Sequence, residues 1–318
     1  MDSSLRRSLA FALALATLTA GCGVFRPKSR RSSPTPHGNF HAPAQPGYGA
    51  QPGYGAPLPP SGAGAAQSKL AGPRWMAVPP TNLLLDPRWG PTLTDIAQRK
   101  PPRETGHWDD PATSAHELSH SIHFELRLLS STDRKRNGFY VPGGRAAIVD
   151  EPAIRKSDVA AWVPPSLRGS RYDHYLAGKP GWDARPLYVW DEWNAYVNGA
   201  AVAIERYELG LELHPENQRS DRVHAALEFT VYATALMLAV AQRDSGAFAR
   251  DPQLAAFFAF NAERAMQVWN RGAGLPPFRW DDGPRLIGAL RGSADAEALR
   301  AQVRALYGPA WTQRVFGF

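Results

Sequence analysis

Two histidines four residues apart, His116 and His120, restrict the fold of this chain more than any other feature of its sequence. On a helix with about 3.6 residues per turn, positions four apart project from one face, so both imidazoles can bind a single metal ion. A catalytic zinc site uses three protein ligands and leaves one position open for water. The chain must therefore bring a third ligand from a distant segment to the helix that carries residues 115–120.

The two histidines belong to the pattern H-E-x-x-H, in which Glu117 directly follows the first of them. This pattern resembles that of the zincin metallopeptidases. The resemblance implies that His116 and His120 bind Zn²⁺ and that Glu117 acts as the general base toward the bound water. The longer metzincin pattern would need glycine at position 123 and histidine at position 126, where this chain has His123 and Leu126. The metzincin branch is therefore excluded.

A second interpretation uses the same residues without a metal. Ser114 and Glu117 match the capping box S-x-x-E, in which the glutamate side chain turns back to the start of the helix. His116 and His120 would then form a polar stripe on a helix that begins near Pro111. A helix is expected under both interpretations, so the helix alone does not distinguish them.

The third ligand is expected from a second helix within residues 187–206, a long apolar run with Glu192 near its start. Ala195 and Gly199 follow at i+3 and i+7, so small side chains lie beside Glu192 and let two helix backbones approach closely. This E-x-x-A arrangement resembles the gluzincin branch of the zincins, which implies that Glu192 completes the site. Three other glutamates remain candidates: Glu205, Glu208 and Glu228, the last of which interrupts an apolar run where an isolated charge is costly.

The metal ligands need supporting groups, and here the chain departs from the thermolysin-like gluzincins. Those enzymes carry an aspartate four residues after the ligand glutamate, whereas this chain has Tyr196. Support for a metal-bound histidine must then come from a backbone carbonyl or from Asp191, Asn194 or Asn198. Peptide hydrolysis also needs a donor for the oxyanion. Tyr188, one turn before Glu192, is the first choice, and the other candidates are Tyr172, His174, Tyr175 and His224.

The N-terminal part of the chain indicates export and lipid attachment. Residues 1–21 combine two arginines with a short apolar run, which is typical of a signal peptide. They lead into Leu-Thr-Ala-Gly-Cys, which resembles a bacterial lipobox with Cys22, the only cysteine, as the lipidated residue. Gly23 after it suggests the outer membrane by the same resemblance. An incidental cysteine after a conventional secretory signal is the alternative.

Residues 22–72 are rich in proline, glycine, serine and alanine and cannot bury a core, so we expect a disordered tether. Basic residues in this tether supply part of the formal charge of +7, and no nucleic-acid-binding motif accompanies them. Residues 73–318 are expected to form one zincin-like domain. Its predicted fold class is α+β and predominantly helical.

The secondary structure of this domain follows from its patterns. Residues 138–149 read as a β-hairpin around Pro-Gly-Gly. Its edge strand could pair with an extended substrate, or the hairpin could equally be a structural flap. Further helices are predicted at residues 92–99, 220–243, 251–271 and 294–307, and a strand at 82–85. The apolar run 225–241 is predicted to be a core helix and not a membrane span.

Together these features predict a zinc-dependent peptidase that is lipid-anchored in the cell envelope and acts on a peptide or protein substrate. The alternative is a non-catalytic envelope lipoprotein whose globular domain binds a partner or the cell wall. The substrate and the oligomeric state do not follow from the sequence.

Overall fold

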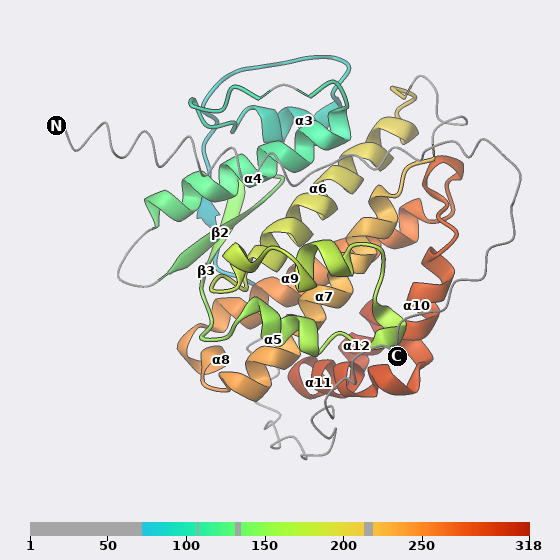
Figure 1. Cartoon of the computed structure of the whole chain (residues 1–318). Helices are drawn as coiled ribbons and strands as arrows, with labels where there is room; N and C mark the ends of the chain where they lie inside the picture. Colours follow the sequence, from blue (N-terminus) through green and yellow to red (C-terminus); the bar gives the residue numbers. More distant parts are fainter. Residues whose placement is uncertain (1–71, 107, 131–134, 213–218) are drawn as a thin grey trace, which may run out of the picture. The chain divides into compact units, whose positions relative to one another are not determined.

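The structure is a computed structural model that describes residues 72–106, 108–130, 135–212 and 219–318. The expected signal peptide, Cys22 and all of the expected tether except its last residue lie outside the described residues. Within them the fold is α+β and predominantly helical, which confirms the predicted class. Four helices form the centre of this fold (Figure 1): α4 (Pro111–Leu129), α6 (Tyr188–Glu208), α7 (Arg222–Arg243) and α9 (Pro252–Gly272).

The described residues contain one small antiparallel sheet with the strand order β1-β3-β2. Strands β2 (Arg136–Val141) and β3 (Arg145–Asp150) form the predicted hairpin, and β1 (Met76–Ala77) pairs with the outer edge of β3. The turn needs glycine, because Gly143 and Gly144 have φ angles of 98° and 68°. The inner faces of β2 and β3 are buried against α4 and α9.

The strand predicted at residues 82–85 is wrong. These residues form an irregular loop, and Leu83, Leu84 and Leu85 are 85%, 48% and 75% exposed. The neighbouring side chains favour turns: Asn82 Oδ1 accepts from Leu84 N, and Asp86 Oδ1 accepts from Arg88 N. A strand also needs a partner, and β1 already occupies the outer edge of β3.

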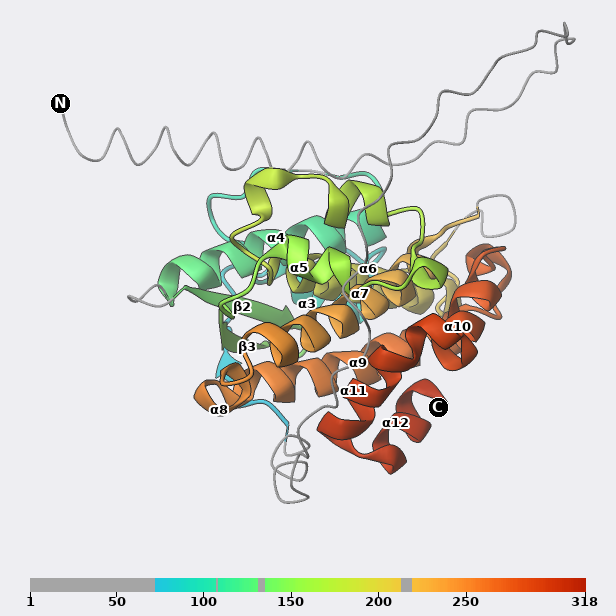
Figure 2. The same cartoon turned by 60° about the horizontal axis from the view of Figure 1, so that its bottom comes forward.

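The predicted helices are present with small shifts at their ends, and several short helices were not predicted. The starts of α4 and α9 are fixed by N-caps. The side chains of Asp110 and Asp251 accept hydrogen bonds from Thr113 N and Gln253 N respectively. The α-helices are α3 (Gly90–Ala97), α4 (Pro111–Leu129), α5 (Lys156–Ala161), α6 (Tyr188–Glu208), α7 (Arg222–Arg243), α8 (Ala247–Arg250), α9 (Pro252–Gly272), α10 (Gly283–Gly292), α11 (Glu297–Tyr307) and α12 (Pro309–Phe316). A π-helix spans Tyr172–Ala177. Helices α10, α11 and α12 group together beside α7 and α9 (Figure 2).

Helix α4 packs on two sides, and this fixes the direction of its histidines. Its apolar stripe, spaced three and four residues apart, joins a small core cluster with α3 and β2; the stripe consists of Ala115, Leu118, Ile122 and Leu126. The adjacent stripe of His116, His120 and His123 contacts α6. Burial of the apolar stripe therefore turns the histidines toward α6.

Helix α7 is long and apolar enough to cross a membrane by length and composition alone. All of its apolar window is buried inside the fold, however, as expected for a core helix. It packs between α6 and α9 and contributes Phe229, Tyr232 and Leu236 to the main core cluster. This burial supports the prediction of a core helix at residues 225–241.

Candidate metal centre

Helices α4 and α6 approach each other closely at Gly199. A Cβ atom at this position would lie 2.9 Å from the carbonyl oxygen of Ala112 and 3.4 Å from Cβ of His116. Any larger residue would thus push the helices apart. The small side chain expected beside Glu192 does allow the two backbones to come together, and this brings Glu192 within reach of the histidines.

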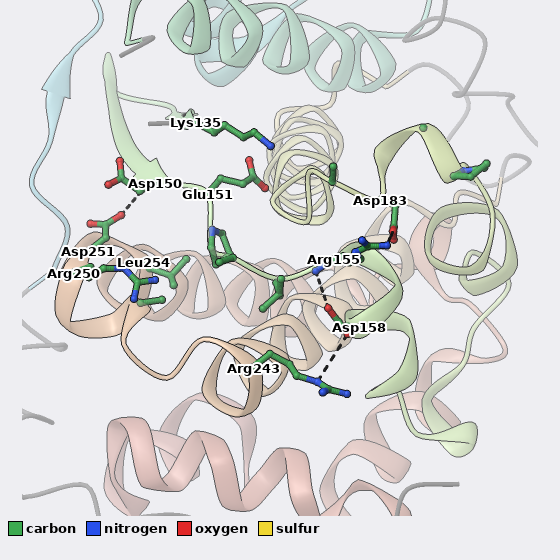
Figure 3. Close-up of a pocket in the computed structure, with 17 residues that line it drawn as sticks. Lys135, Asp150, Glu151, Arg155, Asp158, Asp183, Arg243, Arg250, Asp251 and Leu254 are labelled. Atoms are coloured by element: carbon green, nitrogen blue, oxygen red, sulfur yellow. Dashed lines mark hydrogen bonds and ion pairs between the residues drawn. The ribbon is translucent and has the colours of Figure 1, made fainter. Parts of the chain in front are cut away.

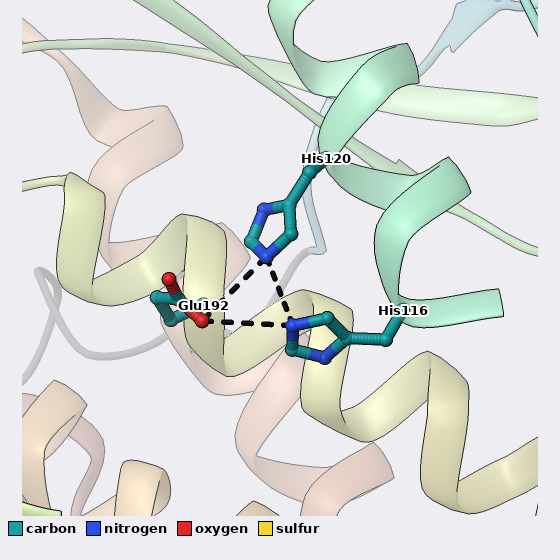
Figure 4. Close-up of side chains that lie close together, drawn as sticks. All are labelled: His116, His120 and Glu192. Atoms are coloured by element: carbon teal, nitrogen blue, oxygen red, sulfur yellow. Dashed lines mark hydrogen bonds and ion pairs between the residues drawn. The ribbon is translucent and has the colours of Figure 1, made fainter. Parts of the chain in front are cut away.

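His116, His120 and Glu192 meet at the interface between these helices (Figure 4). The Nε2 atoms of the two histidines are 3.0 Å apart. The Oε2 atom of Glu192 lies 3.6 Å from Nε2 of His116 and 3.5 Å from Nε2 of His120. Ligand atoms of a tetrahedral zinc ion, bound at about 2.0–2.1 Å, are about 3.3–3.4 Å from one another. The triangle therefore has the size that a zinc ion requires.

The carboxylate of Glu192 gives a second reason to expect a cation. Its Oε2 atom is buried and makes no hydrogen bond within the described part of the chain. A buried carboxylate oxygen without a partner is costly. Because this oxygen faces two imidazole nitrogens, a metal ion between the three atoms would satisfy it.

The protonation states also suit metal binding. Burial, together with the neighbouring charge of His120, lowers the pKa of His116 to about 3, so its imidazole is neutral at pH 7. Burial alone would raise the pKa of Glu192, but attraction by His120, His116 and Lys179 outweighs burial and lowers it. A neutral imidazole and an ionised carboxylate are the forms that bind zinc.

The low pKa of His116 predicts a pH dependence of stability in the metal-free chain. Its folded pKa is about 3, and its unfolded pKa is about 6.5. Between these values the unfolded state binds more protons, so the free energy of unfolding falls as the pH falls through this range. We expect His116 to account for a loss of about 2 kcal/mol between pH 7 and pH 5.

Urea unfolding after chelation, at both pH values, measures this loss. The variant His116→Gln should lose correspondingly less stability than the wild type, because glutamine does not titrate. Equal losses in the two proteins would show that His116 is not the group responsible.

Asp191 is the residue that supports the candidate ligand His120, a role that the sequence left open among several residues. Its Oδ1 atom lies 2.8 Å from Nδ1 of His120 and 2.5 Å from Nδ1 of His123. The guanidinium of Arg127 is 3.6 Å from its other oxygen. Burial raises the pKa of Asp191, but the two histidines that contact its carboxylate, His120 and His123, outweigh burial and lower this pKa, so the carboxylate is ionised. An aspartate one residue before Glu192 thus orients His120.

A chain of hydrogen bonds fixes the tautomer of His123. Arg264 Nη1 can only donate, so the atom of Asn194 that it contacts at 3.1 Å is the acceptor Oδ1. The amide nitrogen of Asn194 then donates to the carbonyl of Tyr140 and to Nε2 of His123, at 2.6 and 3.0 Å. His123 must therefore carry its proton on Nδ1 and donate it to Asp191.

This result bears on a second group that could hold a metal, His120, His123 and Asp191. Their contacts have hydrogen-bond lengths, and His123 Nδ1 is a donor in this network. His120 also contacts Asp191 through Nδ1, so in its neutral form its Nε2 atom carries the lone pair, on the side that faces His116 and Glu192. We therefore assign this second group to the support of the first.

The capping-box interpretation is wrong, because α4 begins earlier than it requires. Asp110 is the N-cap, and Ser114 lies inside the first turn, where its hydroxyl donates to the carbonyl of Trp108. Glu117 is therefore not the third residue of the helix and does not reach back to its start. Its side chain is buried, with 7% of the residue exposed, next to His116 in sequence.

The other candidate glutamates have different partners. Glu205 accepts from the backbone and hydroxyl of Thr92 at the start of α3, and Glu208 pairs with Arg271 at the surface. Glu228 is fully buried in α7, where it accepts from Arg171 and from the hydroxyl of Tyr232. The charge of Glu228 is thus compensated by an ion pair and needs no metal.

The candidate oxyanion donors are spread over the region around α6. Tyr188 is buried at the start of α6, its ring stacks on Trp182, and its hydroxyl accepts from Lys179 at 3.1 Å; its catalytic role stays a prediction. Two of the other candidates already have partners: the hydroxyl of Tyr172 donates to the carbonyl of Ala160, and His224 lies 3.8 Å from both Glu228 and Asp282. His174 is exposed.

Tyr196 lies closer to the ligands than the sequence suggested. Its ring contacts that of His116, with centroids 4.4 Å apart, and its hydroxyl is 3.1 Å from that of Tyr175. Burial and the charge of Glu192 raise the pKa of Tyr196 to about 12, so it remains a hydrogen-bond donor at pH 7. Tyr196 lies four residues after Glu192 and therefore on the same helix face. This spacing could have identified it from the sequence, where it was noted only as the residue that replaces an aspartate of thermolysin-like enzymes.

The edge of β2 is not open for substrate pairing at its centre. Residues 137–141 are buried, and the carbonyl of Tyr140 accepts from the side-chain amides of Asn194 and Asn198. Gly138 is packed so closely that a Cβ atom there would lie 2.4 Å from Cβ of Leu126. The hairpin thus holds α6 beside the candidate site through the carbonyl of Tyr140, and the buried centre of β2 is closed to pairing with a substrate strand.

A cavity of about 1040 Å³ lies at the N-terminal end of α6, but the three candidate ligands do not line it. Its charged side chains pair mainly with one another, as Arg155 does with Asp183 and Arg243 with Asp158 (Figure 3). Glu151 at its edge accepts from Leu187 N at 2.7 Å. This cavity is therefore separate from the candidate metal centre.

Comparison of the chain with protein-family models, with curated proteins and with solved structures finds no match.

Proposed function

We propose that this protein is a zinc-dependent peptidase of the gluzincin type. The observation that carries the proposal is the orphaned Oε2 of Glu192, which faces Nε2 of His116 and His120 at distances suited to one zinc ion. In the H-E-x-x-H pattern, Glu117 directly follows His116 in the sequence, and its side chain is buried. A merely structural metal site would not need this residue.

Each residue of the site has a role in the proposed reaction. His116, His120 and Glu192 would hold the ion, which supplies a Lewis acid and lowers the pKa of a water molecule. Glu117 would accept the proton of that water and pass it to the leaving amine. Tyr196, protonated at pH 7 and in contact with His116, is placed to donate to the oxyanion, as Tyr188 is by its sequence position.

The place of action is part of the same proposal. The predicted lipobox cysteine, Cys22, would attach the chain to a membrane of the cell envelope, and residues 23–72 would link it to the domain. The substrate would be a peptide or protein in that compartment. An envelope-binding role without catalysis becomes the better proposal if the metal centre fails the test below.

The zinc content of the purified full chain tests the site. We expect near-stoichiometric zinc in the wild type and its loss in Glu192→Gln, because the amide keeps the size of the side chain and removes the charge of the ligand. Asp191→Asn should bind zinc about 10- to 100-fold more weakly, since His120 would lose its orienting carboxylate. Glu208→Gln is the matched control: it lies on the same helix, is paired with Arg271 and should keep its zinc.

Metal analysis after dialysis, combined with circular dichroism, separates loss of metal from loss of fold. A folded wild type that takes up no zinc would contradict the proposal. Zinc retained in Glu192→Gln would mean that another residue is the third ligand.

A further inference from the structure

Three consecutive leucines project into solvent from the loop between β1 and α3. Leu83, Leu84 and Leu85 are 85%, 48% and 75% exposed, and together they expose about as much surface as two isolated leucines. Single exposed apolar residues are ordinary, but a contiguous apolar run on the surface indicates an interaction site. This loop has no part in the candidate metal centre.

The loop is held in place by hydrogen bonds to the end of α3. The backbone nitrogens of Thr81 and Asn82 both donate to the carbonyl of Gln98, at 2.7 and 3.2 Å. The side chain of Asn82 donates to the carbonyl of Ala97 at 3.1 Å and accepts from Leu84 N at 3.0 Å. The exposure of the leucines is therefore built into an ordered loop.

The base of the loop carries cations and an aromatic ring. Arg88 pairs with Asp86, and Lys100 lies beside Thr81, whose hydroxyl donates to the carbonyl of Lys100 at 2.6 Å. Trp89 is half-buried at the start of α3. If the leucines at the tip of the loop enter the acyl-chain layer of a bilayer, the basic and aromatic residues at its base lie at the level of the anionic headgroups. This is the order in which such residues occur at membrane interfaces.

We propose that this leucine loop, residues 83–85, inserts into the surface of an anionic lipid bilayer, with the basic residues at its foot facing the headgroups. A second copy of the chain is a poorer occupant, because a stable protein interface buries about 800 Å² on each partner, far more than three leucines provide. A bilayer needs only a small apolar insertion as a second anchoring signal beside a lipid chain. The loop would thereby orient the domain on the membrane, whether or not the metal centre is catalytic.

A fluorophore attached at the loop tests the insertion. In the full chain with Cys22→Ser, an introduced cysteine is the only thiol, because the sequence has a single cysteine. Leu83→Cys and the control Leu129→Cys, which is 75% exposed at the end of α4, are each labelled with an environment-sensitive dye. Because Cys22→Ser removes the predicted lipid site, an N-terminal hexahistidine tag in place of residues 1–21 holds the chain on the vesicles. These consist of phosphatidylethanolamine with about a quarter phosphatidylglycerol and a small share of a nickel-chelating lipid.

We expect the emission at position 83 to shift to the blue and to rise about twofold or more, and that at position 129 to stay constant. In a chain labelled at position 84, replacing Leu83 and Leu85 by serine should abolish the rise. No change at position 83 in vesicle-bound protein, or an equal rise at both positions, would overturn the proposal. A rise without vesicles that grows with protein concentration would identify a second copy as the occupant and would also overturn it.

Discussion

Replacement of Glu117 by glutamine is expected to reduce the cleavage of fluorescently labelled casein by a factor on the order of 10² to 10⁴, with the zinc content unchanged. Glutamine keeps the size of the side chain but cannot accept a proton. The reduction should appear in kcat, because the general base acts in the transition state and contributes little to the binding of substrate. Measurement of kcat and KM on casein, with zinc analysis of the same samples, checks this expectation.

Glu125→Gln is the matched control, because Glu125 lies two turns further along α4 and outside the ligand group. It should leave both cleavage and zinc content unchanged. Loss of zinc in Glu117→Gln would mean that Glu117 helps to hold the metal centre together. A zinc-loaded wild type that cleaves neither casein nor a degenerate peptide library would contradict the peptidase proposal and would favour a non-catalytic envelope protein with a metal site.

Removal of the carboxylate of Glu228 is expected to destabilise the fold by about 3–5 kcal/mol, the usual cost of breaking a buried ion pair from one side. Glu228 is fully buried and accepts from the backbone nitrogen of Arg171 at 2.8 Å and from its guanidinium at 3.2 Å. In Glu228→Ala the guanidinium of Arg171 keeps Asp221 as an acidic partner. Urea unfolding measures the loss.

Two comparisons show whether the loss comes from the ion pair. Glu208→Ala removes an exposed carboxylate paired with Arg271, which is also exposed, and should cost less than about 1 kcal/mol. The double variant Arg171→Met with Glu228→Leu should recover much of the stability, because it leaves no buried charge behind. Loss of zinc from folded Glu228→Ala would contradict the assignment and return Glu228 to the list of ligands.

The sequence could predict that His116 and His120 face one side because their spacing follows from helix geometry, whereas Glu192 was favoured among four glutamates by the resemblance to gluzincins. The spacing of His116 and His120 and the small residue at Gly199 determine which faces can meet, and the structure brings Glu192 to the histidines. The role of Asp191 could only be listed among several, because it depends on the rotation of α6 against α4. That rotation is set by packing between segments about seventy residues apart.

The errors of the sequence interpretation have a common physical cause. An apolar run at residues 82–85 reads as a strand, yet strand formation needs an unpaired edge, and its location is a property of the whole fold. The edge of β2 was expected to be free, but Asn194 and Asn198 from a distant helix already bond to it. Both features depend on what other segments cover, and no local pattern contains this information.

The two asparagines of α6 also set the register of this helix against its neighbours. Asn194 bonds to His123 on α4, and Asn198, one turn later, bonds to Ser119 on the same helix. Both donate to the carbonyl of Tyr140 and accept from Arg264 of α9. A slip by one residue, about 1.5 Å along the axis and 100° around it, would break these bonds together. The depth at which Glu192 meets α4 is therefore fixed by two side-chain amides in the following turns of its own helix.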